Sequence, residues 1–107
     1  MSPLLSLALQ HGGWEERGIR VPAAQLLAFL TDAHAQSVNV TYIECLYVAV
    51  GSTEPSMELS AQPSQFSTWD EFVSFASAAV EKAIFRASTG DCRRASGPAE
   101  AVFEVGH

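Results

Sequence analysis

The sequence predicts one α+β domain over residues 1–107, a two-layer sandwich with two helices on one face of a mostly antiparallel sheet. Three observations predict this class. Residues 37–51 form a long run of β-branched and aromatic residues, which is typical of a strand. Residues 22–35 and 69–87 repeat their apolar side chains at helical spacing. The expected order is ββαββα, followed by a further strand.

The N-terminal residues are expected to form two short strands. Leucines occupy alternate positions in residues 4–10, which predicts the first strand. Two glycines at 12–13 favour a turn. Residues 14–21 then predict a second strand, antiparallel to the first and broken at Gly18.

Residues 22–35 are expected to form the first helix. Pro22 suits the first helical position, where its missing N–H would have no partner in any case. Apolar side chains follow with helical spacing at Ala23, Leu26, Leu27, Leu30 and Ala33.

The strand at residues 37–51 is expected to lie at the centre of the sheet. Successive side chains of a strand point to opposite faces. The even-numbered set is the more apolar one, and we expect it to face the helices: Val38, Val40, Tyr42, Leu46, Val48 and Val50. Glu44 interrupts this set, and it marks a β-bulge, the end of the strand, or a carboxylate with a particular partner.

A loop is expected at residues 51–56 and a short strand at residues 57–61. Alternation in this strand places Met57 and Leu59 inward. Pro63 ends the strand because proline cannot donate to a ladder.

The second helix has the clearest end signals. Thr68 and Glu71 have the spacing of a capping box, and Gly90 marks the C-terminal stop. The apolar stripe consists of Trp69, Phe72, Val73, Ala76, Ala79, Val80, Ala83, Ile84 and Ala87. Phe85 lies nearly opposite this stripe and is expected to be exposed. Residues 88–98 predict a mobile loop, and residues 99–105 alternate as an edge strand would.

The charge balance favours a basic partner over nucleic acid. Six Lys and Arg against twelve Asp and Glu give a formal charge of −6. Such a field repels phosphate backbones and steers basic proteins toward the surface. It also keeps a small protein soluble without any partner.

Nothing in the sequence predicts a membrane or secretory segment. No stretch approaches the ~20 apolar residues of a membrane helix, and the apolar N-terminal run lacks a basic flank. Cys45 and Cys92 could form one bridge, but two cysteines do not make a disulfide framework. We therefore expect a cytoplasmic protein with reduced thiols.

Motifs for chemistry are scarce. The three histidines lack metal-ligand spacing and no phosphate-binding glycine loop occurs, so we expect neither metal nor cofactor. Cys45 with His11 or His34 is the one nucleophile–base combination to consider. A cysteine within a core strand is more often a small apolar residue.

A small acidic domain without a catalytic constellation is typical of a stoichiometric binding protein. In size, charge and α+β layout the chain resembles the immunity proteins that neutralise bacterial polymorphic or contact-dependent growth-inhibition toxins. The resemblance implies inhibition of a basic toxin, such as a nuclease, by occlusion of its active site. Acidic side chains would replace the substrate phosphates while an apolar anchor fills the cleft.

The candidate partner-binding residues are acidic side chains outside helix-capping roles, together with exposed aromatic residues. They are Trp14, Glu15, Glu16, Glu54, Glu58 and Phe85. We expect a monomer if the protein is an inhibitor. The first alternative is a dimeric secretion chaperone or adaptor that associates through a sheet edge or Phe85. The second is a small enzyme that uses Cys45.

Overall fold

The computed structural model describes residues 2–49, 51–89 and 99–106. Its elements are α1 (Pro3–Gln10), β1 (Trp14–Glu15), β2 (Ile19–Pro22), α2 (Leu26–Ala35), β3 (Tyr42–Ala49), β4 (Ser52–Ala61), α3 (Trp69–Thr89) and β5 (Glu100–Gly106). The strands form one antiparallel sheet in the order β1-β2-β5-β3-β4. The predicted α+β class, with helices on one face of an antiparallel sheet, is confirmed. The described residues contain three helices, however, where two were predicted.

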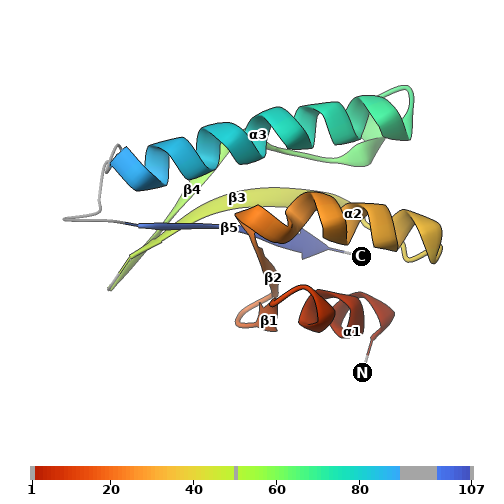
Figure 1. Cartoon of the computed structure of the whole chain (residues 1–107), viewed down its shortest axis with the longest axis horizontal. Coiled ribbons are helices and arrows are strands. Elements are labelled where there is room, and N and C mark those ends of the chain that lie inside the picture. Colours follow the sequence, from red (N-terminus) through yellow and green to blue (C-terminus); the bar gives the residue numbers. More distant parts are fainter. Residues whose placement is uncertain (1, 50, 90–98, 107) are drawn as a thin grey trace.

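The helices form a layer over the sheet (Figure 1). In this layer α2 packs against both α1 and α3. Side chains from the helices and the sheet meet in one apolar core, to which Phe29, Phe72 and Phe103 each contribute a fully buried ring.

Residues 3–10 form helix α1, so the strand predicted there is wrong. The Ser2 hydroxyl accepts a hydrogen bond from the Leu5 N–H at 3.1 Å, and Pro3 occupies the first helical turn. Leu4, Leu7 and Ala8 are buried at helical spacing. A short apolar run fits both periods, and the N-terminal cap decides between them here.

The predicted second strand is a hairpin of β1 and β2. Arg17 has φ 58° and Gly18 has φ 149°, so the chain reverses between the two strands. Pro22 ends β2 instead of starting a helix. A short 3-10 turn, Ala23–Gln25, follows it, and α2 begins at Leu26.

Strand β3 is shorter than predicted but is an interior strand, paired with β4 and β5. The face assignment was wrong within β3, although two members of the predicted inward set are buried: Val40, which precedes the strand and belongs to the core, and Leu46. The odd-numbered Ile43, Cys45 and Tyr47 belong to the core, whereas Glu44 points to the other face. An apolar layer has no place for an unpaired carboxylate, and this arrangement keeps Glu44 on the face turned away from the helices.

Residues 52–61 form one long edge strand, β4, so the predicted loop at residues 51–56 is wrong. The register of β4 against β3 shifts between Ile43 and Cys45, beside Glu44, and the extra residues lie in β4. The Ser60 hydroxyl accepts from the Cys45 N–H at 3.0 Å and donates to the Ser56 carbonyl at 2.7 Å. The bulge expected at Glu44 therefore occurs in the neighbouring strand. It turns Met57 outward, with 76% of its surface exposed, contrary to prediction.

Helix α3 begins at its predicted cap. The Thr68 hydroxyl accepts from the Glu71 N–H at 3.1 Å. The Glu71 carboxylate accepts from the Ser67 N–H at 3.2 Å, one residue before the expected partner. Phe85 is 67% exposed, as predicted, whereas Ile84 of the predicted buried stripe is 40% exposed.

Strand β5 lies in the middle of the sheet, between β2 and β3, and not at its edge. Of the predicted loop at residues 88–98, residues 88–89 belong to α3 and the others lie outside the described residues, as does the Gly90 stop. In the described part of the chain, no helix combines the length and the apolar character needed to cross a membrane.

Candidate functional site

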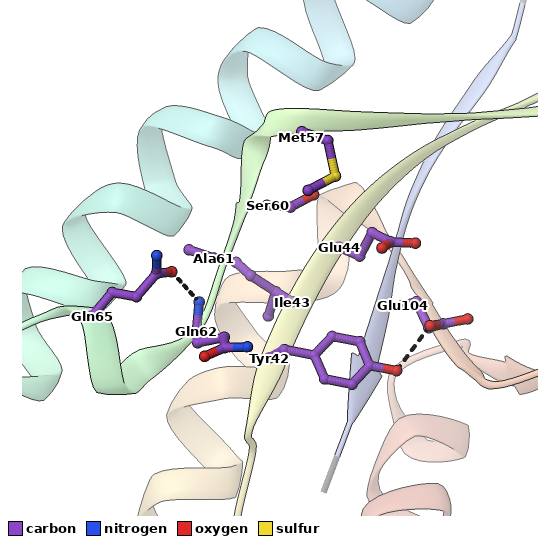
Figure 2. A pocket seen from close by; sticks show the side chains of 9 residues that line it. All are labelled: Tyr42, Ile43, Glu44, Met57, Ser60, Ala61, Gln62, Gln65 and Glu104. Atoms are coloured by element: carbon purple, nitrogen blue, oxygen red, sulfur yellow. Dashed lines mark hydrogen bonds between the residues drawn. The ribbon is translucent and has the colours of Figure 1, made fainter.

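A cavity of about 540 Å³ opens on the sheet face turned away from the helices. Figure 2 shows that its walls come from β3, β4, β5 and the segment after β4. Tyr42, Glu44 and Glu104 form the acidic side, while Met57 and Gln62 lie on the β4 side.

Two carboxylates lie next to each other in this cavity. Glu44 of β3 and Glu104 of β5 are direct cross-strand partners. Like charges directly opposite each other destabilise a sheet. The ion pairs recorded among the described residues are His11–Asp32, Arg20–Glu16 and Arg86–Glu58, and none of them involves Glu44 or Glu104. Within the described part of the chain, no lysine or arginine forms an ion pair with either carboxylate, although Arg20 of β2 is the cross-strand neighbour of Glu104 on the side away from Glu44.

Tyr42 holds one of these carboxylates in place. Its hydroxyl donates a hydrogen bond to Glu104 Oε2 at 2.8 Å. Burial, then the hydrogen bond to Glu104, then the charges of Glu104 and Glu44 raise the pKa of Tyr42 to about 12. Gly106 lies opposite Tyr42, and the phenol ring occupies the space that a Cβ atom would need there. The glycine therefore lets the ring lie close to the strand.

Trp14 lies at the far end of the same sheet row, and Glu16 follows directly after β1. Trp14 pairs with Arg20, and Arg20 pairs with Glu104. The Arg20 side chain is 9% exposed, and its Nη1 lies 3.5 Å from Glu16 Oε2. Its buried Nε has no hydrogen-bond partner among the described residues. Arg20 therefore separates the two predicted residues from the acidic pair.

The other predicted residues lie elsewhere. Glu15 is exposed in β1, at the sheet edge opposite to β4, which carries Glu54 and Glu58. Glu58 forms an ion pair with Arg86 of α3, and hydrogen bonds to Glu58 and Tyr47 raise the pKa of Arg86 further. Phe85 is exposed on α3, in the helix layer. The structure does not bring the six predicted residues together on one surface.

Sequence reasoning missed Tyr42 and Glu104 and left the role of Glu44 open. Alternation in residues 99–105 already indicated that Glu104 shares a strand face with Val102. The pairing of Glu104 with Glu44 joins two residues that are 60 positions apart in the sequence. No local pattern marks such a pairing.

The residues of the predicted enzyme alternative, Cys45, His11 and His34, lie outside the acidic cavity. Cys45 is fully buried in the core, where a substrate would not reach its thiol. His11 Nε2 lies 2.8 Å from Asp32 Oδ2, and the His34 ring stacks on Trp69. Among the described residues, no group of three or more His, Cys, Asp and Glu side chains is placed to hold a metal ion.

Comparison with known proteins finds no match for this chain among protein-family models, curated proteins or solved structures.

Proposed function

We propose that this protein is a stoichiometric inhibitor of a basic protein, of the kind that bacterial immunity proteins represent, and that it acts in the cytoplasm. The observation that carries the proposal is the Glu44–Glu104 pair. Its two carboxylates are cross-strand neighbours, they line an open cavity, and no described lysine or arginine forms an ion pair with either.

This arrangement costs the free protein stability and favours a complex. Repulsion between the two carboxylates is present as long as no cation lies between them. A lysine or arginine of a partner would turn that repulsion into attraction on binding. The formal charge of −6 would raise the rate of association with a basic protein. Occupying the phosphate-binding cations of a nuclease in this way would exclude its substrate.

The exposed ring of Phe85 supports the chaperone alternative, because exposed aromatic residues often anchor an interface. The sheet edge supports it less well. Pro55 in edge strand β4 has no N–H to offer a second strand, and the register shift interrupts the same strand. We therefore place the inhibitor first.

The test is capture of a partner by the tagged protein from lysate of the native host, with mass spectrometry and an activity assay of the captured protein. The expected partner is a basic protein whose activity falls to zero at a 1:1 ratio. Glu44→Gln should weaken this complex about tenfold or more, since a charge-assisted contact is lost. Glu81→Gln, which removes the same charge from the exposed surface of α3, is the matched control. Capture of several unrelated secreted proteins, or of none, would contradict the proposal.

A further inference from the structure

The acidic cavity is the first of three that follow one another along the end of the sheet. A second cavity of about 360 Å³ shares Tyr42 and Gln62 with it. A third, of about 350 Å³, shares Asn39, Val40 and Pro63 with the second. Because neighbouring cavities share these lining residues, the three follow the linker between α2 and β3 from the open sheet face toward the helix layer. We call this row of cavities the linker groove.

The far end of the linker groove is aromatic. His34, in the last turn of α2, stacks on Trp69, the first residue of α3. The ring centroids lie 4.7 Å apart with an interplanar angle of 11°. His34 is exposed and Trp69 half-buried, and both line the third cavity. A flat aromatic surface of this kind suits an apolar or aromatic side chain.

Building on the proposed function, we propose that an extended segment of the basic partner lies in the linker groove. An arginine of this segment would enter the acidic cavity, and an apolar side chain a few residues away would pack on His34 and Trp69. Charge complementarity at one end and aromatic surface at the other select this occupant.

Arginine fits the acidic cavity better than lysine does. Its planar guanidinium has five N–H donors, so it can donate to Glu44 and Glu104 at once and still reach a side-chain carbonyl such as that of Gln62. The four steps from Val38 to Tyr42 span at most about 14 Å. An extended segment of about five residues covers this distance between Val38, which lines the third cavity, and Tyr42, which lines the acidic cavity, and the long side chains at its two ends add further reach.

The probes are the pentapeptides Ac-Arg-Gly-Gly-Gly-Phe-NH₂ and Ac-Phe-Gly-Gly-Gly-Arg-NH₂, together with N-acetylarginine amide. Binding is followed by ¹H–¹⁵N NMR on the full chain. One of the two pentapeptides should perturb both Glu104 and His34, and should bind about tenfold or more tightly than N-acetylarginine amide, because its two contacts are linked. Citrulline, a neutral analogue of arginine, should abolish binding when it replaces the arginine.

Two variants locate the contacts. Glu44→Gln should remove binding of both the pentapeptide and N-acetylarginine amide. His34→Ala should reduce the pentapeptide affinity to that of N-acetylarginine amide and leave the affinity of the latter unchanged. Glu81→Gln, the matched control, should change neither affinity.

Equal binding of the citrulline peptide, a pentapeptide no tighter than N-acetylarginine amide, or no binding at millimolar concentration would each overturn the inference. The outcomes also distinguish failure of this inference from failure of the proposed function. If a basic partner is captured and inhibited but neither Glu44→Gln nor His34→Ala weakens the complex, the groove is not its site and the inhibitor remains. If the pentapeptide binds as expected but no basic partner is inhibited, the proposed function fails alone.

Discussion

Replacing Glu44 by glutamine is expected to stabilise the isolated protein. Directly opposite residues in neighbouring antiparallel strands have Cβ atoms about 5 Å apart. Two unit charges at about 5 Å repel each other by about 0.8 kcal/mol in water and by about 3 kcal/mol at an effective dielectric constant of 20. Glu44 and Glu104 are half-buried, their side chains can bend apart, and the positive Arg20 is the cross-strand neighbour of Glu104 on its other side, which lowers the net repulsion. We therefore expect the free energy of unfolding to rise by about 0.5–1 kcal/mol, within the range for cross-strand pairs.

The assay is thermal and urea unfolding of wild type, Glu44→Gln and Glu81→Gln at low and high salt. For a domain of this size the gain corresponds to a rise in Tm of about 2–8 °C. The gain should shrink in 1 M salt, where the screening length falls to about 3 Å. Glu81→Gln controls for the change in net charge. If Glu44→Gln were no more stable than Glu81→Gln at low salt, the carboxylates would not repel each other as argued, and the main support of the proposed function would be lost.

Three further predictions test the site and the core. Ionisation of Tyr42 is followed by the absorbance difference between wild type and Tyr42→Phe. Its midpoint should lie near pH 12, and Glu104→Gln should move this midpoint toward the ordinary value of 10.0. Because the folded-state pKa is raised, the stability that the neutral phenol contributes is present in full below pH 10.0 and is lost as the pH rises through about 12; a midpoint near 10 in the native protein would contradict the contact with Glu104. Phe72→Ala should cost about 3–5 kcal/mol of unfolding free energy in urea titrations, whereas Phe85→Ala should change it by about 0.5 kcal/mol or less; equal losses would mean that the core assignment is wrong. Thr68→Ala removes the cap of α3 and should cost about 1 kcal/mol by the same assay, with Thr68→Ser as a control that keeps the hydroxyl.

The surface that carries the proposal differs from the one that the sequence indicated. Sequence reasoning selected acidic residues outside helix caps, among them Glu58. The structure gives Glu58 a partner, Arg86, on the neighbouring helix. It leaves Glu44 and Glu104 without an ion-pair partner among the described residues. Whether a carboxylate is already neutralised depends on neighbours that are distant in the sequence.

Local signals in the sequence determined the elements whose ends are marked by backbone chemistry. The Thr68 cap and the apolar period of 3.6 residues predicted α3, and the β-branched run predicted β3. Both follow from interactions within a few residues, so a single sequence contains them. The same kind of signal, Ser2 followed by Pro3, was present before α1, but the prediction for residues 4–10 used only the alternate leucines.

Tertiary structure alone decided the order of the strands and the faces of the sheet. Residues 99–105 have the alternation of an edge strand, but β2 and β3 flank β5 on both sides. The two faces of β3 were both apolar enough to be buried, and packing of the helices against Ile43 and Cys45 selected one of them. The pairing of Glu44 with Glu104 follows from these choices. Strand register between distant segments depends on the whole fold, which is why the acidic cavity could not be predicted from the sequence.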